Sequence, residues 1–176
     1  VVVSADDPSM HSSQNEQDSR VYGKFALMPT FEPSNQQECY DMVQYAFDYS
    51  EKFRVPVLMR MTTRLAHSRS GVVCKEPKPQ NEISVPENLR QFVLLPAISK
   101  RNYKTLLGKQ EEFIQHGEND GWNVLTEGTD KKYGIIASGI AYNYLMENYP
   151  NRDIPYSVLK ISQYPLPVNM IIKLAQ

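Results

Sequence analysis

SNQQECYDMVQYAFDYSEKFRVPVLMRM, residues 34–61, contains the clearest helix and the clearest strand of the sequence. Ser34 and Gln37 have the spacing of a capping box, in which two side chains satisfy backbone donors at the start of a helix. Apolar residues then recur at helical spacing, which predicts a helix over residues 35–53: Cys39, Met42, Val43, Ala46, Phe47 and Phe53. Val55–Met61 is mostly apolar, as is typical of a central strand of a parallel sheet that is covered on both faces.

The residues before this stretch complete a strand, helix, strand unit. Val1–Ala5 is a candidate strand, residues 6–18 form a polar loop, and weaker patterns predict a short helix at 20–26 and a short strand at 30–32. Two parallel strands joined through a helix imply a right-handed crossover. We therefore expect residues 1–74 to belong to one α/β domain.

The sequence changes character after residue 74. A polar stretch with four prolines, at 77, 79, 86 and 96, favours an extended connector, and a helix is expected at residues 103–116 before a turn at Asp120 and Gly121. A second α/β unit follows, with strands at 134–137 and 156–161, a helix at 140–149 and another from residue 168, in the order of a parallel sheet. The expected division is an α/β domain at 1–74, a linker with a bracing helix at 75–132, and the start of another α/β domain at 133–176.

Composition restricts the class of protein. Lysine and arginine total 19 against 20 acids, with no block of like charge, so no nucleic-acid partner is expected. No apolar run approaches the roughly 20 residues of a membrane helix and no signal peptide is recognisable, which favours a cytoplasmic protein with no membrane partner. Cys39 and Cys74 lack the spacing of a zinc or iron–sulfur site and are expected to be reduced thiols, with Cys39 on the buried side of its helix. The chain opens without methionine and stops inside an apolar helical pattern, so we expect a piece of a longer protein.

Two loops that follow predicted strands carry most of the reactive side chains, and ligands of parallel sheets bind at the carboxyl ends of strands. The first loop, residues 7–18, is dense in hydroxyls, amides and acids, and its His11 could donate a proton near neutral pH. The second loop, residues 62–69, contains Arg64, which could bind a carboxylate or phosphate, with Thr62 and Thr63 as further donors. The alternative for both is an ordinary solvated surface loop. The pair Ser138 and Gly139, and the group Asp120, Gly121 and Asn123, are better explained as turns, and no metal site is expected.

Several blocks of sequence together resemble a known family. They are ADDPSMHSSQNEQD at residues 5–18, PVLMRMTTR at 56–64 with HSR at 67–69, FVLLPA at 92–97, KYGIIASGIAY at 132–142 and YPLP at 164–167. In this order they resemble the alpha subunits of indolepyruvate ferredoxin oxidoreductases, a family of thiamine-diphosphate-dependent 2-oxoacid ferredoxin oxidoreductases. The resemblance extends over nearly the whole chain.

The resemblance implies an enzyme that oxidatively decarboxylates aryl pyruvates such as indolepyruvate, passes the electrons to ferredoxin and transfers the aryl-acetyl group to coenzyme A. It implies thiamine diphosphate with magnesium, 4Fe–4S clusters and a beta subunit as partner. Residues 1–74 would be the later part of a pyrimidine-binding-type α/β domain, and residues 133–176 the start of a transketolase C-terminal-like α/β domain. The activating glutamate, the diphosphate and magnesium domain and the cluster region would lie outside, so this piece alone is expected to bind no cofactor and to be inactive.

The family pattern also implies roles for residues of the two loops. His11 would be catalytic, and the residues that would face the substrate or cofactor are Ser12, Gln14, Asn15, Gln17, Asp18, Thr63, Arg64 and His67. Ser9 stands where the family pattern has glycine, which would strain a backbone that needs positive φ. The proposed pocket requires both loops to meet at one rim of the sheet.

Two alternatives stay open. The chain could belong to a related thiamine-dependent 2-oxoacid oxidoreductase with another substrate, or it could be a non-catalytic assembly module whose loops contact a partner subunit.

Overall fold

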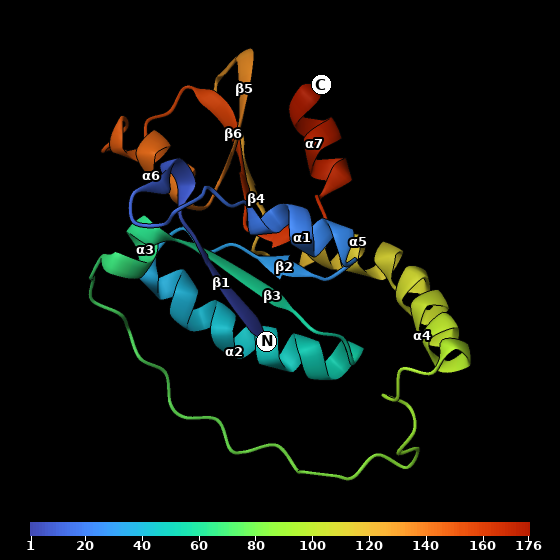
Figure 1. Cartoon of the computed structure of the whole chain (residues 1–176). Coiled ribbons are helices and arrows are strands. Elements are labelled where there is room, and N and C mark those ends of the chain that lie inside the picture. The colour runs from blue at the N-terminus through green and yellow to red at the C-terminus, as the bar shows by residue number, and fades with distance from the viewer.

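The computed structural model describes all 176 residues and contains two sheets flanked by helices (Figure 1). The first sheet has the order β1-β3-β2-β7, formed by β1 (Val2–Asp6), β3 (Leu58–Thr62), β2 (Thr30–Phe31) and β7 (Gln163–Tyr164). β1, β3 and β2 are parallel, whereas β7 is antiparallel to β2. The strands predicted at 1–5, 30–32 and 55–61 are confirmed, but the sheet is mixed because a strand from the far end of the chain pairs with it.

α2 (Gln36–Phe53) connects β2 to β3 and covers one face of this sheet. Its buried side chains Met42, Ala46, Tyr49 and Phe53 join an apolar core with four residues from the sheet and from α5: Phe31, Val57, Met59 and Phe113. Each of the valine, methionine and phenylalanine side chains in this core contributes about 1.5–3 kcal/mol on burial. The apolar spacing in the sequence therefore identified the helix and part of its buried face, but Val43 and Phe47 are exposed at 40% and 54%, and the buried Tyr49 was not among the predicted residues.

The capping of α2 differs from the prediction by one residue. Asn35, not Ser34, is the N-cap, and its side-chain oxygen accepts the amide N–H of Glu38 at 2.9 Å. The Glu38 carboxylate in turn accepts both the backbone N–H and the hydroxyl of Ser34 at 2.8 Å. A carboxylate is a stronger acceptor than the Gln37 amide, so Glu38 takes this position.

The other face of the first sheet is polar, which corrects the expectation of a strand with two apolar faces. Arg60 of β3 is buried there together with Asp6 and Glu32. α1 (Ser19–Phe25) covers this face, and Gly23 lets it approach closely, because a Cβ at that position would lie 2.2 Å from the Thr30 hydroxyl.

The second sheet has the order β4-β6-β5, with β4 (Val124–Thr126), β6 (Tyr156–Ile161) and β5 (Asp130–Ser138). β5 and β6 are parallel and joined through α6 (Gly139–Glu147), and α7 (Val168–Ala175) follows β7. These strands and helices were predicted, but β4, which is antiparallel to β6, was not. At three residues, β4 is too short to show an alternating pattern.

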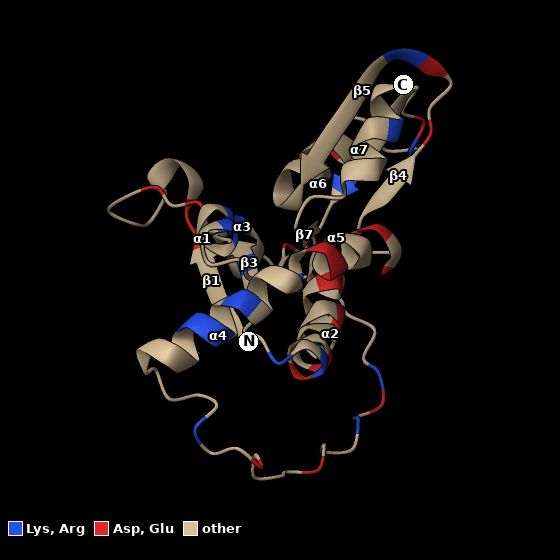
Figure 2. Ribbon diagram, turned by 90° about the vertical axis from the view of Figure 1, so that its right-hand side faces the viewer, with Lys and Arg blue, Asp and Glu red and all other residues tan.

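Residues 68–95 form no helix or strand and lead into α4 (Pro96–Gly108) and α5 (Gln110–Asn119). The single helix predicted at 103–116 is therefore two helices that meet at Lys109, and the first begins earlier because Pro96 is well suited to an initial helical position. The connector is nearly all exposed and arches away from the sheets (Figure 1). Charges of both signs are spread along the ribbon (Figure 2). No helix combines the length and apolar character needed to cross a membrane.

Candidate functional site

Asp7, directly after β1, connects the two loops that the sequence singled out. One of its carboxylate oxygens accepts the backbone N–H groups of Ser12 at 2.6 Å and Ser13 at 2.7 Å. The other accepts the hydroxyl of Thr63 at 3.0 Å, at the start of α3 (Thr63–His67). The hydrogen bond from the Ser12 amide is the largest cause that lowers the pKa of Asp7 below its ordinary value. The second loop is thus a short helix rather than an irregular segment, and Asp7 fixes it against the first loop.

The first loop adopts the conformation that its sequence makes difficult. Ser9 and Met10 lie in the left-handed region with φ of 65° and 54°, within the short 3-10 turn Pro8–Met10. Ser9 therefore has the positive φ that was expected at this position, although it is not glycine and its Cβ makes this conformation unfavourable. Such a conformation costs roughly 1–2 kcal/mol per residue compared with the right-handed one. The hydrogen bonds to Asp7 hold the loop in this shape.

A buried ionic network lies beneath the loop at the carboxyl ends of β1, β2 and β3. The guanidinium of Arg60 donates to Asp6 at 2.5 Å and also pairs with Glu32. Asp6 accepts the backbone N–H of Ser19 at 2.8 Å as well as its hydroxyl, which anchors the start of α1. Burial works to raise the pKa of Asp6, but the hydrogen bonds from Ser19 and Arg60 outweigh it and the pKa is lowered.

The network continues to the second α/β unit. Arg20 pairs with Asp18 through two nitrogens, at 2.8 and 2.7 Å, and donates to the Ser138 hydroxyl at 3.1 Å. Tyr164 of β7 donates its hydroxyl to Glu32 at 2.8 Å, and burial, followed by the charge of Glu32, raises the Tyr164 pKa to about 12. These bonds fix the two units against each other beside the site.

Gly139, at the start of α6, is required by this arrangement. Its φ is +50°, and a Cβ there would lie 2.4 Å from a carboxylate oxygen of Glu32. Ser138 and Gly139 thus make the turn that was favoured from the sequence, and the Ser138 hydroxyl serves the network.

The sequence-predicted site residues divide into two groups. The exposed group consists of His11, Ser12, Gln14, Asn15, Gln17, Arg64 and His67. Thr63 and Asp18 are partly buried and their polar atoms are occupied, Thr63 by Asp7 and Asp18 by Arg20. The Arg64 guanidinium lies over the ring of Tyr144 on α6, 5.8 Å from its centroid, which leaves its edge available to an anion.

Sequence reasoning missed the residues that build the network. They are Asp6, Asp7, Arg20, Glu32, Arg60 and Tyr164. One signal was available, because Arg60 interrupts an apolar strand between Met59 and Met61, and arginine is almost never fully buried without a partner. The partners themselves come from distant parts of the chain and have no shared pattern.

Two further expectations from the sequence concern residues away from the network. Asn123 makes a structural turn, as predicted, and bonds the backbone of Gly117, Ser162 and Gln163 at 2.7–2.9 Å. The two cysteines are free thiols, and burial raises the pKa of Cys39 to about 11.

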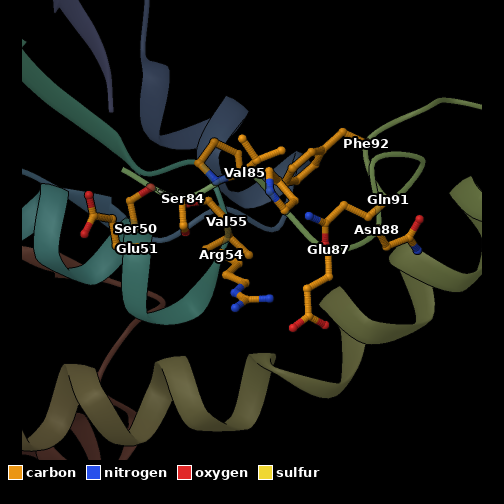
Figure 3. Close-up of a pocket in the computed structure, with 12 residues that line it drawn as sticks. Ser50, Glu51, Arg54, Val55, Ser84, Val85, Glu87, Asn88, Gln91 and Phe92 are labelled. Carbon is orange, nitrogen blue, oxygen red and sulfur yellow. Dashed lines mark hydrogen bonds between the residues drawn. The ribbon is translucent and has the colours of Figure 1, made fainter. Parts of the chain in front are cut away.

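A large hollow lies away from these loops, between the end of α2 and the connector (Figure 3). It encloses about 820 Å³ and is lined mainly by polar residues, among them Glu51, Arg54, Glu87 and Gln91. Arg54 and Val55 precede β3, so the hollow lies at the amino end of that strand, opposite to the network. Since it shares none of the network residues, we do not place the site there.

Comparison with curated proteins finds relatives whose names agree with the resemblance carried by the sequence blocks. The chain is 45% identical over 175 residues to indolepyruvate oxidoreductase subunit IorA of Archaeoglobus fulgidus, and 40% identical over 174 residues to that of Methanothermobacter marburgensis. The subunit of Pyrococcus abyssi is 41% identical over 184 aligned residues. The matches cover 97–100% of this chain. The chain is homologous to a stretch of the IorA subunits.

The chain spans about 28% of the length of these relatives. No family model matches it. The relatives are, by name, subunits of an oxidoreductase that acts on indolepyruvate.

Proposed function

We propose that, within its full-length subunit, this chain forms one wall of the active site of an enzyme that oxidatively decarboxylates aryl pyruvates, indolepyruvate above all, to aryl-acetyl-coenzyme A with ferredoxin as electron acceptor. The observation that carries the proposal is the 37–45% identity, over 84–100% of the chain, to curated subunits named for indolepyruvate. The name "subunit" also supports a second kind of subunit, the beta subunit, in the assembly.

The arrangement of elements is compatible with the two domains that the resemblance implies. Residues 1–74 contain three parallel strands with the α2 crossover, as a pyrimidine-binding-type domain would. Residues 133–176 contain the parallel pair β5 and β6 with α6, as the start of a transketolase C-terminal-like domain would. We propose this division for the full-length subunit.

The buried acids of the network, Asp6, Asp7 and Glu32, do not fit the magnesium and diphosphate of the proposed cofactor. A magnesium ion needs carboxylate oxygens that are free to bind it. The Asp6 carboxylate accepts hydrogen bonds from Ser19 and Arg60. The Asp7 carboxylate accepts them from Ser12, Ser13 and Thr63. The Glu32 carboxylate pairs with Arg60 and accepts the hydroxyl of Tyr164. We therefore propose that these groups, like the 4Fe–4S clusters, are held by other parts of the enzyme.

Two exposed residues of this chain, Arg64 and His11, suit the 2-oxo acid substrate. Arg64 presents a guanidinium that is already oriented by the Tyr144 ring, which suits the carboxylate of a 2-oxo acid. His11 is exposed on the adjoining loop, and we assign its imidazole the role of proton donor to the bound substrate. Asp7 and Thr63 keep the loop and α3 at a constant distance from each other.

Reconstitution of the full-length subunit with its partner tests the proposal. Thiamine diphosphate, coenzyme A and a series of 2-oxo acids are supplied, and ferredoxin reduction is followed. Arg64→Ala is expected to raise KM for indolepyruvate about tenfold or more, the effect of losing one charge-assisted contact. Arg69→Ala is the control, because Arg69 is also exposed but lies beyond α3.

His11→Ala is expected to lower kcat by about a hundredfold, the usual contribution of a positioned proton donor. Turnover of an aliphatic 2-oxo acid in preference to aryl pyruvates would point to the related enzyme instead. Unchanged turnover of both variants with weakened subunit association would favour the assembly module.

A further inference from the structure

An apolar surface spans the outer side of α1 and the chain after β7. Val21 and Phe25, one helical turn apart on α1, are 63% and 88% exposed. Leu166, Val168 and Ile172 on the other side are 46%, 47% and 50% exposed. We call these five residues the apolar face. Three of them, Val21, Leu166 and Val168, line one groove, and large apolar side chains exposed around a shared groove mark a contact surface rather than a solvated one.

This groove lies between α1 and the residues that follow β7. It encloses about 470 Å³ between α1, α5 and residues 164–168. Its walls are mainly apolar, and include Val21, Leu27, Ile114, Leu166 and Val168. A pocket of this kind, ringed by exposed apolar residues, is the form taken by the centre of a protein interface, where one large side chain of the partner is inserted.

The charges at the rim limit what the groove can receive. Arg20 lines it, but its guanidinium is occupied by Asp18 and Ser138. Lys24 also lines it, is exposed, and has no ion-pair partner in the structure. An apolar segment with an acidic residue placed near Lys24 would therefore match the surface in both shape and charge.

We propose that the apolar face is covered by a segment of the same full-length polypeptide outside residues 1–176, with an apolar side chain in the groove and an acidic residue opposite Lys24. Transient interfaces are no more apolar than the rest of a protein surface, so a patch like this one belongs to a permanent contact. The relatives provide the chain that such a contact requires, since the homologous stretch is only about 28% of their length. A covalently connected segment also has a high effective concentration and would cover the face without any partner.

Photo-crosslinking in the assembled enzyme tests this proposal independently of activity. Benzoylphenylalanine is placed at position 25 of the full-length subunit, and the crosslinked peptides are identified by mass spectrometry. The expected product joins position 25 to a peptide of the same polypeptide outside residues 1–176. Mixing isotopically light and heavy subunits separates a link within one chain from a link between two copies. A link to the beta subunit, a link between two copies, or no link at all would each overturn the proposal.

Two valines provide matched variants. Val168 lines the groove and is 47% exposed, whereas Val124 on β4 is 45% exposed and lies outside it. Val168→Glu is expected to reduce the crosslink at least about tenfold, because a carboxylate buried without a partner is strongly unfavourable. Val124→Glu should leave the yield unchanged. An equal loss in both variants, or no loss in Val168→Glu, would show that the groove does not hold the segment.

Discussion

Asp7 is the residue on which the geometry of the candidate site depends most. Asn at this position keeps the size but loses the negative charge and one acceptor, so the bonds from the Ser12 and Ser13 amides weaken and the Thr63 hydroxyl can no longer donate to the second oxygen. We expect Asp7→Asn to lower kcat/KM of the reconstituted enzyme about ten- to a hundredfold, since misplacement of about 1 Å can have that effect. Hydrogen exchange at the Ser12 and Ser13 amides should become faster. Asp48→Asn is the control, because Asp48 is exposed and pairs only with surface Lys78, and an equal loss in both variants would refute a positioning role.

The two cysteines should differ in reactivity. Burial raises the pKa of the Cys39 thiol to about 11, whereas Cys74 is exposed. Because the thiolate is the reactive form, alkylation of Cys39 at pH 8 should be roughly two orders of magnitude slower than that of an unperturbed thiol. Peptide mass spectrometry after timed iodoacetamide treatment measures both rates. Rapid labelling of Cys39 in the folded protein would contradict its partly buried position and its raised pKa.

At the scale of elements, the start of α2 allows a direct test of the corrected cap. Asn35→Ala removes the acceptor for the Glu38 amide and should lower the free energy of unfolding by about 1 kcal/mol. Asn151→Ala is the control, since Asn151 is exposed in a turn. Urea denaturation followed by circular dichroism measures both. An unchanged free energy of unfolding in Asn35→Ala would contradict the cap at Asn35.

The elements that the sequence identified are those whose burial pattern is local. α2 shows its apolar face every three to four residues, and β1, β5 and β6 are apolar runs between clear breaks, so each was found from neighbouring residues alone. β4 and β7 are short, and β7 owes its position to pairing with β2, more than 130 residues earlier in the chain. For the candidate site, too, only local features could be predicted from the sequence. The exposed loop residues could be listed from the sequence, but the contacts of Asp6, Glu32 and Arg60 depend on the assembled sheet.

For the molecule as a whole, Arg60 is the cation that allows two acids to be buried between β1 and β2. Arg60→Met would leave Asp6 and Glu32 without their main partner, and breaking a buried pair in this way costs about 3–5 kcal/mol. Combining Arg60→Met with Asp6→Asn and Glu32→Gln should recover much of this loss, because the charges are then removed together. Urea denaturation compares the two variants. If the triple variant is no more stable than the single one, packing rather than charge is the reason for Arg60.

The same network predicts how stability responds to acid. The pKa values of Asp6, Asp7 and Asp18 are all lowered in the folded chain, while in the unfolded chain they return to about 3.9. The stabilisation by these carboxylates is therefore fully present above about pH 5. It is lost as the pH falls through the pKa of the unfolded chain and then through the lower pKa values of the folded chain, because the unfolded state takes up protons first. Unfolding free energies measured from pH 7 to pH 3 should fall most steeply below about pH 4.5, and less steeply in Asp7→Asn, which has one such carboxylate fewer. An unchanged dependence of the unfolding free energy on pH in Asp7→Asn would show that the Asp7 carboxylate does not have a lowered pKa in the folded chain.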